Sequence, residues 1–208
     1  MSKAATELVA QSWNRSFFLP NPKLGAVVTV RAGNVIGGGD YAQDRIVPDS
    51  VLALLAGQPI PIRNPHAVRP WQHVLECLSG YLWLASKIAS EGKTSPLVTP
   101  FNFGPDPSAR QPVRQLVEEI LLTWPGKWED HSNPNSPHEA RLLALAIEKA
   151  SALLGWRPSW NFKEAVRHTV EWYHQRHVAG NPDMLKFSQA QIDAYVEAGR
   201  RQGMAWAL

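Results

Sequence analysis

The glycine-rich stretch RAGNVIGGGD at residues 31–40 is the segment of this chain best suited to lie against a ligand. It follows the apolar run at residues 26–30, which predicts a buried strand. Glycine lacks a Cβ and tolerates positive φ, so a backbone rich in glycine can approach another group closely. Ligands of α/β sheets bind at the carboxyl ends of strands. A ligand contact and a tight structural turn therefore both remain open for this loop.

A second segment, VRPWQHVLE at residues 68–76, places Arg69 just ahead of an expected helix. The guanidinium fork of arginine grips a diphosphate in a way that lysine cannot match. The alternative for Arg69 is a surface ion pair with Glu76. The glycines of residues 31–40 match neither G-x-G-x-x-G nor the phosphate loop that ends in Gly-Lys-Ser/Thr. The chain therefore contains no dinucleotide fingerprint.

The histidines do not form a metal-binding pattern. His174 and His177 share a predicted helix face, but no His-Glu-x-x-His motif or suitably spaced carboxylate accompanies them. We therefore expect no metal site. His138 and Glu139 are adjacent and could form an acid–base pair, although a helix-start cap is the favoured interpretation.

The bulk composition is that of a globular protein with one large or two small domains. The chain has 208 residues, 44% apolar and 19% charged, with a formal charge of +3. No basic stripe alternates with aromatic residues, so we expect no nucleic-acid binding. The single cysteine, Cys77, excludes an internal disulfide and fits a reducing compartment. With no apolar window of membrane length and no secretion signal, the sequence predicts a cytoplasmic protein without a membrane contact.

Strands and helices are expected to alternate, which predicts an α/β fold with a parallel component. The expected helices cover residues 2–18, 44–55, 70–89 (after an irregular start), 112–124, 148–154, 162–177 and a last one from 188. The expected strands cover residues 24–30, 60–62, 97–103 and 142–147, and residues 126–137 are expected to be irregular. Gly155 is expected to cap its helix. Of the nine tryptophans, Trp83 and Trp172 are predicted to be core residues.

Several motifs, in order, resemble the nucleotide-sugar 4,6-dehydratases of the extended short-chain dehydrogenase/reductase group, and among them the CDP-glucose 4,6-dehydratases. The motifs are SKA at 2–4, RAGNVIGGGD at 31–40, IRNPHAVRPWQHVLE at 62–76, SGYL at 79–82, FNFGPD at 101–106, PHEA at 137–140, LLGWRP at 153–158, TVEWY at 169–173 and QAQI at 189–192. The resemblance covers the C-terminal two-thirds of such enzymes. It implies a partial Rossmann-like sheet that lacks its N-terminal half, plus a smaller α/β substrate-binding domain.

The resemblance also implies a division of the chain into three parts. Residues 1–58 would be the remaining part of the NAD-binding domain, with the loop 31–45 at the substrate site. Residues 59–180 would mainly bind the nucleotide sugar, with helix 76–90 and strand 97–103 returning to the first part. Residues 181–208 would form a helical tail.

The implied reaction converts CDP-glucose into its 4-keto-6-deoxy product by internal redox with NAD and loss of water. Lys3 matches the lysine of the Tyr-x-x-x-Lys motif, whose charge lowers the tyrosine pKa. Lys3 and Ala32 are expected at the cofactor, and Asn34 and Arg69 at the sugar diphosphate. The further expected substrate contacts are Arg45, Arg63, Asn102 and His138.

Some of the pattern is missing. The tyrosine would stand four positions before Lys3, ahead of Met1, and the dehydration residues and glycine fingerprint are also absent. Residues 146–150 read AIEKA, whereas the corresponding segment of the family reads like Asp-x-Ser-Lys-Ala. One hypothesis is a truncated dehydratase that is inactive alone.

A second hypothesis is a non-catalytic nucleotide-sugar-binding or assembly module. Such a module could pair with a separate N-terminal half or form a homodimer through residues 2–18. A third idea is a tryptophan-based lectin for free glycans, which would need no CDP.

Overall fold

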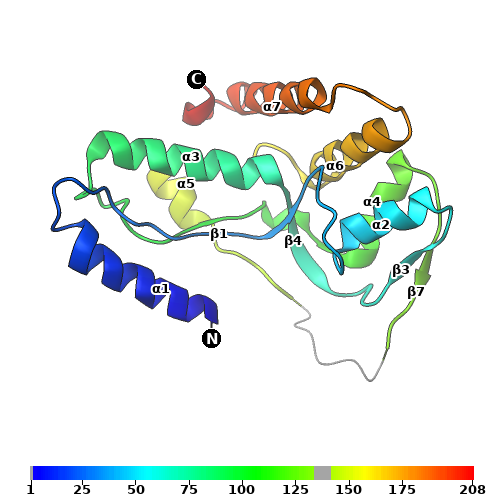
Figure 1. Cartoon of the computed structure of the whole chain (residues 1–208), viewed down its shortest axis with the longest axis horizontal. Helices are drawn as coiled ribbons and strands as arrows, with labels where there is room; N and C mark the ends of the chain where they lie inside the picture. Colours follow the sequence, from blue (N-terminus) through cyan, green and yellow to red (C-terminus); the bar gives the residue numbers. More distant parts are fainter. Residues whose placement is uncertain (1, 134–141) are drawn as a thin grey trace.

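Short strands form three small sheets, and longer helices pack against them (Figure 1). The computed structural model describes residues 2–133 and 142–208. The helices are α1 (Ser2–Trp13), continued by the π-helical turn η1 (Asn14–Phe18), α2 (Ile46–Leu55), α3 (Val74–Glu91), α4 (Val113–Thr123), α5 (Glu148–Leu154), α6 (Phe162–His177) and α7 (Met184–Arg201). The strands are β1 (Val30–Ala32), β2 (Asn34–Ile36), β3 (Ile60–Ile62), β4 (Val68–His73), β5 (Phe101–Phe103), β6 (Arg110–Pro112) and β7 (Trp128–Asp130). Two 3₁₀ turns, Pro107–Ala109 and Ala205–Ala207, complete the described part.

The strand pairing joins the two segments that the sequence singled out. β2 runs parallel to β4, with Asn34 opposite Trp71, and β4 pairs antiparallel with β6. β1 pairs in parallel with β5, and β3 with β7. Because β2 follows β1 after a single residue, the chain passes directly from one small sheet to the next. The α/β class with a parallel component is confirmed.

Several expected boundaries were wrong, and strand pairing explains most of them. The strand expected at 24–30 is assigned only from Val30 to Ala32, and the expected loop 31–40 contains β2. The irregular start of the expected helix 70–89 is strand β4, because it has β2 and β6 on either side. The strand expected at 97–103 is assigned only at Phe101–Phe103, and the region 126–137 contains β7. Of the strand expected at 142–147, only Leu142 forms a bridge, with Val68.

The helices agree better with the sequence. The predicted helices at 44–55, 112–124, 148–154 and 162–177 are confirmed to within two residues at each end. Gly155 ends α5 at φ 61°, a left-handed conformation that suits glycine. The last helix begins at Met184 and not at 188, because the Asp183 side chain accepts a hydrogen bond from the Lys186 amide and caps it.

The buried apolar residues form two main clusters on either side of β4. One joins α2, α4 and α6 around Trp71 and Tyr173, and the other joins β5, α3 and α5 around Phe103 and Trp156. Trp83 and Trp172, expected in the core, are partly buried against these clusters. No helix in residues 2–133 and 142–208 is long and apolar enough to cross a membrane.

Helix α1 is attached to the molecule in an unusual way. None of its residues is buried, and its apolar side chains Leu8, Val9 and Trp13 are 69%, 56% and 56% exposed. Its contact with the sheet is polar, since Glu7 accepts a hydrogen bond from Thr29 at 2.6 Å. Glu7 also pairs with Arg31 at 2.8 Å.

Candidate functional site

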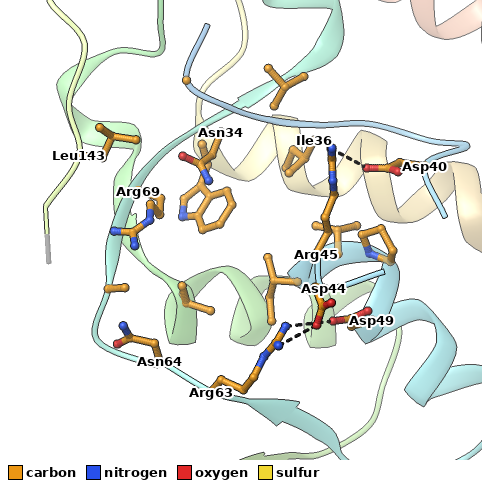
Figure 2. A pocket seen from close by; sticks show the side chains of 18 of the residues that line it. Asn34, Ile36, Asp40, Asp44, Arg45, Asp49, Arg63, Asn64, Arg69 and Leu143 are labelled. Carbon is orange, nitrogen blue, oxygen red and sulfur yellow. Dashed lines mark hydrogen bonds and ion pairs between the residues drawn. The ribbon is translucent and has the colours of Figure 1, made fainter. Parts of the chain in front are cut away.

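A cavity of about 650 Å³ lies where β2, β3, β4 and the start of α2 meet. Figure 2 shows the side chains that surround it. Its wall includes six residues that the sequence assigned to a ligand, namely Lys3, Ala32, Asn34, Arg45, Arg63 and Arg69. These residues come from distant segments, since Lys3 and Arg69 are 66 positions apart in the sequence. A volume of this size is typical of small-molecule and cofactor sites.

Arg69 and Asn34 lie on the same wall of the cavity (Figure 2). They are brought together by the β2–β4 pairing, in which Asn34 stands opposite Trp71. The Trp71 indole donates to the Gln111 carbonyl at 2.9 Å, which fixes this part of the wall. Arg69 is only 8% exposed and donates to the Val68 carbonyl at 3.0 Å. A guanidinium with so little access to water favours an anionic partner.

The alternative interpretation, a surface ion pair of Arg69 with Glu76, is wrong because Glu76 is buried. This side chain is 1% exposed, and its carboxylate accepts from the Ser159 amide, the Trp160 amide and the Tyr195 hydroxyl. Glu76 therefore serves to join α3, the 157–161 segment and α7.

Arg45 and Arg63 enter the cavity beside three carboxylates. Arg45 pairs with Asp40 at 3.2 Å. Arg63 pairs with Asp44 at 2.7 Å and lies 3.7 Å from Asp49. Asp44 has φ 62°, the only non-glycine residue with positive φ in the part of the chain that the structure describes. Residues held in that region of φ cluster at ligand sites.

The glycine loop is clamped by α6, which the sequence did not predict. The Tyr173 hydroxyl donates to the Asp40 carbonyl at 2.6 Å and accepts from the Asp40 amide at 3.0 Å. A Cβ on Gly38 would lie 2.1 Å from the Trp172 ring, so only glycine fits there. Burial raises the pKa of Tyr173 to about 12, which keeps its hydroxyl protonated as a donor. The glycine run and the TVEWY motif were the available signals, but nothing in the sequence connected them.

Among the expected substrate residues that the structure describes, Asn102 is not part of this wall. Asn102 does not line the cavity, because its amide accepts from Arg31 at 2.7 Å and donates to the Ala146 carbonyl at 3.0 Å. It therefore ties β1 to β5 and to the segment before α5. His138 lies outside the described residues.

The histidine pair on α6 has contacts of its own. His177 lies 2.9 Å from the Tyr41 hydroxyl, and His174 packs edge-on against Trp124. Among the residues that the structure describes, no three His, Cys, Asp or Glu side chains are grouped to hold a metal ion.

Sequence comparison supports the resemblance. A CDP-glucose 4,6-dehydratase from Salmonella typhimurium is 41% identical over 207 residues, which cover 96% of this chain and 56% of that protein. The chain is a homologue of the nucleotide-sugar 4,6-dehydratases. A dTDP-glucose 4,6-dehydratase from Haemophilus influenzae is 26% identical over 185 residues, 83% of this chain and 50% of that protein. The chain thus spans about half the length of the curated relatives it matches. No family model matches it.

Solved structures agree on the fold. The dTDP-glucose 4,6-dehydratase from Bacillus anthracis, in complex with NAD, matches with a TM-score of 0.66 and 22% identity, over 84% of this chain and 51% of that one. The UDP-glucose 4-epimerase from Thermotoga maritima, with UDP-glucose, also gives a TM-score of 0.66 at 22% identity, over 84% and 52%. The predicted extended short-chain dehydrogenase/reductase fold is therefore confirmed for the part of the fold that this chain covers.

Proposed function

We propose that these 208 residues carry the nucleotide-sugar site of a 4,6-dehydratase, with CDP-glucose as the substrate. The observation that supports this most is the gathering of Lys3, Ala32, Asn34, Arg45, Arg63 and Arg69 around one cavity. These residues were assigned through the family resemblance, and they come from separate segments of the chain. The identity of 41% to a CDP-glucose 4,6-dehydratase supports the choice of nucleotide.

In this proposal Arg69 and Asn34 hold the diphosphate of the substrate. The guanidinium of Arg69 neutralises the negative charge, and its low exposure makes that interaction stronger than at an open surface. Asn34, on the neighbouring strand β2, donates a hydrogen bond from its side-chain amide to a phosphate oxygen. Arg45 and Arg63 then flank the rest of the nucleotide, each already oriented by a carboxylate.

The solved dTDP-glucose 4,6-dehydratase from Bacillus anthracis and the UDP-glucuronic acid 4-epimerase from Bacillus cereus are complexes with NAD. When bound, NAD would take a hydride from sugar carbon 4 and return it to carbon 6 after the loss of water. Lys3 and Ala32 both line the cavity, which fits their expected place at the cofactor. The sequence contains no glycine-rich turn for the dinucleotide phosphates. These residues by themselves therefore do not hold the whole cofactor.

The same reasoning separates binding from turnover. The residues proposed for binding are in this chain, whereas the 208 residues contain no Tyr-x-x-x-Lys motif to transfer a proton. We therefore propose that the 208 residues bind the substrate and do not complete the reaction alone. The alternative, a binding or assembly module that pairs with a separate N-terminal half, is favoured by the same distribution of residues.

Calorimetry with CDP-glucose tests the binding site. We expect saturable binding, reduced about 10- to 100-fold by Arg69→Ala, because hydrogen bonds to a charged group contribute roughly 1.5–3 kcal/mol. Arg176→Ala is the matched control, since Arg176 is exposed on α6 and does not line the cavity. Equal binding by both variants would contradict the assignment.

An assay for the 4-keto product, with CDP-glucose and NAD, tests the second claim. We expect no turnover by the 208 residues, and any sustained product formation would show that they suffice. Product that appears only after a separate N-terminal half is added would support the assembly alternative.

A further inference from the structure

The cavity wall mixes apolar residues with two groups of charged or amide side chains. Arg69 and Asn34 occupy one side, and Arg63, Asp44 and Asp49 gather on another (Figure 2). In the second group two carboxylates share one guanidinium. The group has two acidic side chains and one basic side chain, so its formal charge is −1. A nucleotide that places its diphosphate at Arg69 would therefore direct its base toward a site rich in hydrogen-bond acceptors.

The two carboxylates of this group differ in how they are used. Asp44 lies 2.7 Å from Arg63 and its side chain is 79% exposed. Asp49 lies 3.7 Å from Arg63, which is longer than a hydrogen bond, and its side chain is 30% exposed. Asp49 is also fixed by its place in the first turn of α2, where its amide donates to the Arg45 carbonyl. Arg63 is thus held mainly by Asp44, while Asp49 presents a carboxylate to the cavity from a rigid element.

We propose that Asp49 selects cytosine by accepting a hydrogen bond from the exocyclic amine of the base. This inference rests on the proposed function, because it assumes that a nucleotide sugar binds here. On the ring carbon that carries this amine in cytosine, uracil and thymine carry a carbonyl oxygen. An ionised carboxylate has no proton to give to that oxygen, and the two acceptors repel each other. The positively charged side of the cavity recognises the diphosphate common to all three nucleotides, so it cannot discriminate among them.

Calorimetry with CDP, UDP and dTDP tests this assignment on the 208 residues. The unsubstituted chain should bind CDP at least about tenfold more tightly than UDP or dTDP, because a site built to pair with a donor rejects a ligand that lacks it. Asp49→Asn should remove most of that preference, since an amide can donate as well as accept. Asp193→Asn, an exposed change on α7 that does not line the cavity, should keep it.

The outcomes separate this inference from the proposed function. If none of the three nucleotides binds, both fail. If all three bind with similar affinity, or if Asp49→Asn keeps the preference for CDP, the nucleotide site stands and the role of Asp49 is overturned.

A second measurement needs no variant and so does not depend on the folding of Asp49→Asn. N4,N4-dimethyl-CDP keeps the ring, the ribose and the diphosphate but lacks the amine hydrogens. We expect the unsubstituted chain to bind it about tenfold more weakly than CDP, with UDP measured beside it. Equal affinity for CDP and its dimethyl derivative would overturn the proposal.

Discussion

Glu76 is a carboxylate at the meeting point of three segments, with almost no access to water. Burial raises its pKa to about 7, opposed by hydrogen bonds from the Trp160 and Ser159 amides and from the Tyr195 hydroxyl. Tyr195 also contacts Ser79 at 2.9 Å, so the cluster joins α3 to α7. The protonation of this one side chain is therefore linked to the stability of the fold.

The link has a definite sign. The folded pKa of Glu76 is above its unfolded value of 4.5, so its contribution is full below pH 4.5 and is lost as pH rises through about 7. We expect the unfolding free energy, relative to Glu76→Gln, to fall by about 2 kcal/mol between pH 5 and pH 8. Urea unfolding of both proteins at each pH measures this. The comparison with Gln matters because His73, whose pKa burial lowers to about 3, acts in the opposite direction below pH 6.5.

Gly38 gives a second prediction for a single residue. Gly38→Ala would force a Cβ against the Trp172 ring, and overpacking of this kind costs about 1–3 kcal/mol. Because the loop lines the cavity, binding of CDP-glucose should weaken as well. Gly25→Ala is the control, since a Cβ there meets nothing within 4 Å. Urea unfolding of both variants measures the difference in unfolding free energy. Equal stability of the two variants would contradict the prediction.

At the level of the residue, type and chemistry carried the sequence prediction part of the way. Arg69 and Asn34 were identified by motif, and the structure places both at the cavity. Asn102 shows the limit, because an amide looks the same in sequence whether it faces a ligand or ties two segments of backbone together. The roles of Arg69 and Asn34 toward a ligand stay predictions.

Helix α6 is the element that fixes the shape of the site. Asn161 and Glu164 form a reciprocal cap at its start, and Tyr173, three turns later, holds the glycine loop. The helix packs on α4 and β4, so its position is set by the core. Anything that frays α6 should therefore also loosen the cavity wall.

The cap supplies a test of that connection. Asn161→Ala should lower the unfolding free energy by about 1 kcal/mol, because an amide at the helix start is left without its partner. Hydrogen exchange should show faster opening of the first turn of α6, while α4 stays protected. Asn21→Ala, which changes an exposed turn, is the comparison, and equal loss of stability in the two would mean that the cap is not special.

Helices were easier to predict than strands for a physical reason. The periodicity of an amphipathic helix is repeated over several turns, as in α4 and α6, and caps mark its ends. Most strands here have three residues, too few to show alternation. β6 and β7 are defined by partners forty or more residues away, which no local pattern encodes.

The cavity takes its wall from distant parts of the chain, from residues as early as Lys3 and as late as Leu143. The proposed division near residues 58 and 180 remains a prediction, as does a homodimer through α1.

A ligand that touches so many segments should stabilise them together. At 100 times its dissociation constant CDP-glucose would add about 2.7 kcal/mol. We expect a rise of about 5–10 °C in Tm for a chain of this size. Glucose alone should give none, and a rise with glucose would point to the lectin alternative.

The polar attachment of α1 has a consequence for experiments on this site. Lys3 stands at the start of a helix that Glu7 fastens by a charge pair with Arg31, whose side chain is 40% exposed. Dissolved ions weaken such a pair, whereas they leave apolar packing largely intact. Ionic strength should therefore govern how firmly Lys3 is presented to the cavity, and affinities measured in dilute and in concentrated buffer will differ even for ligands that never touch the lysine.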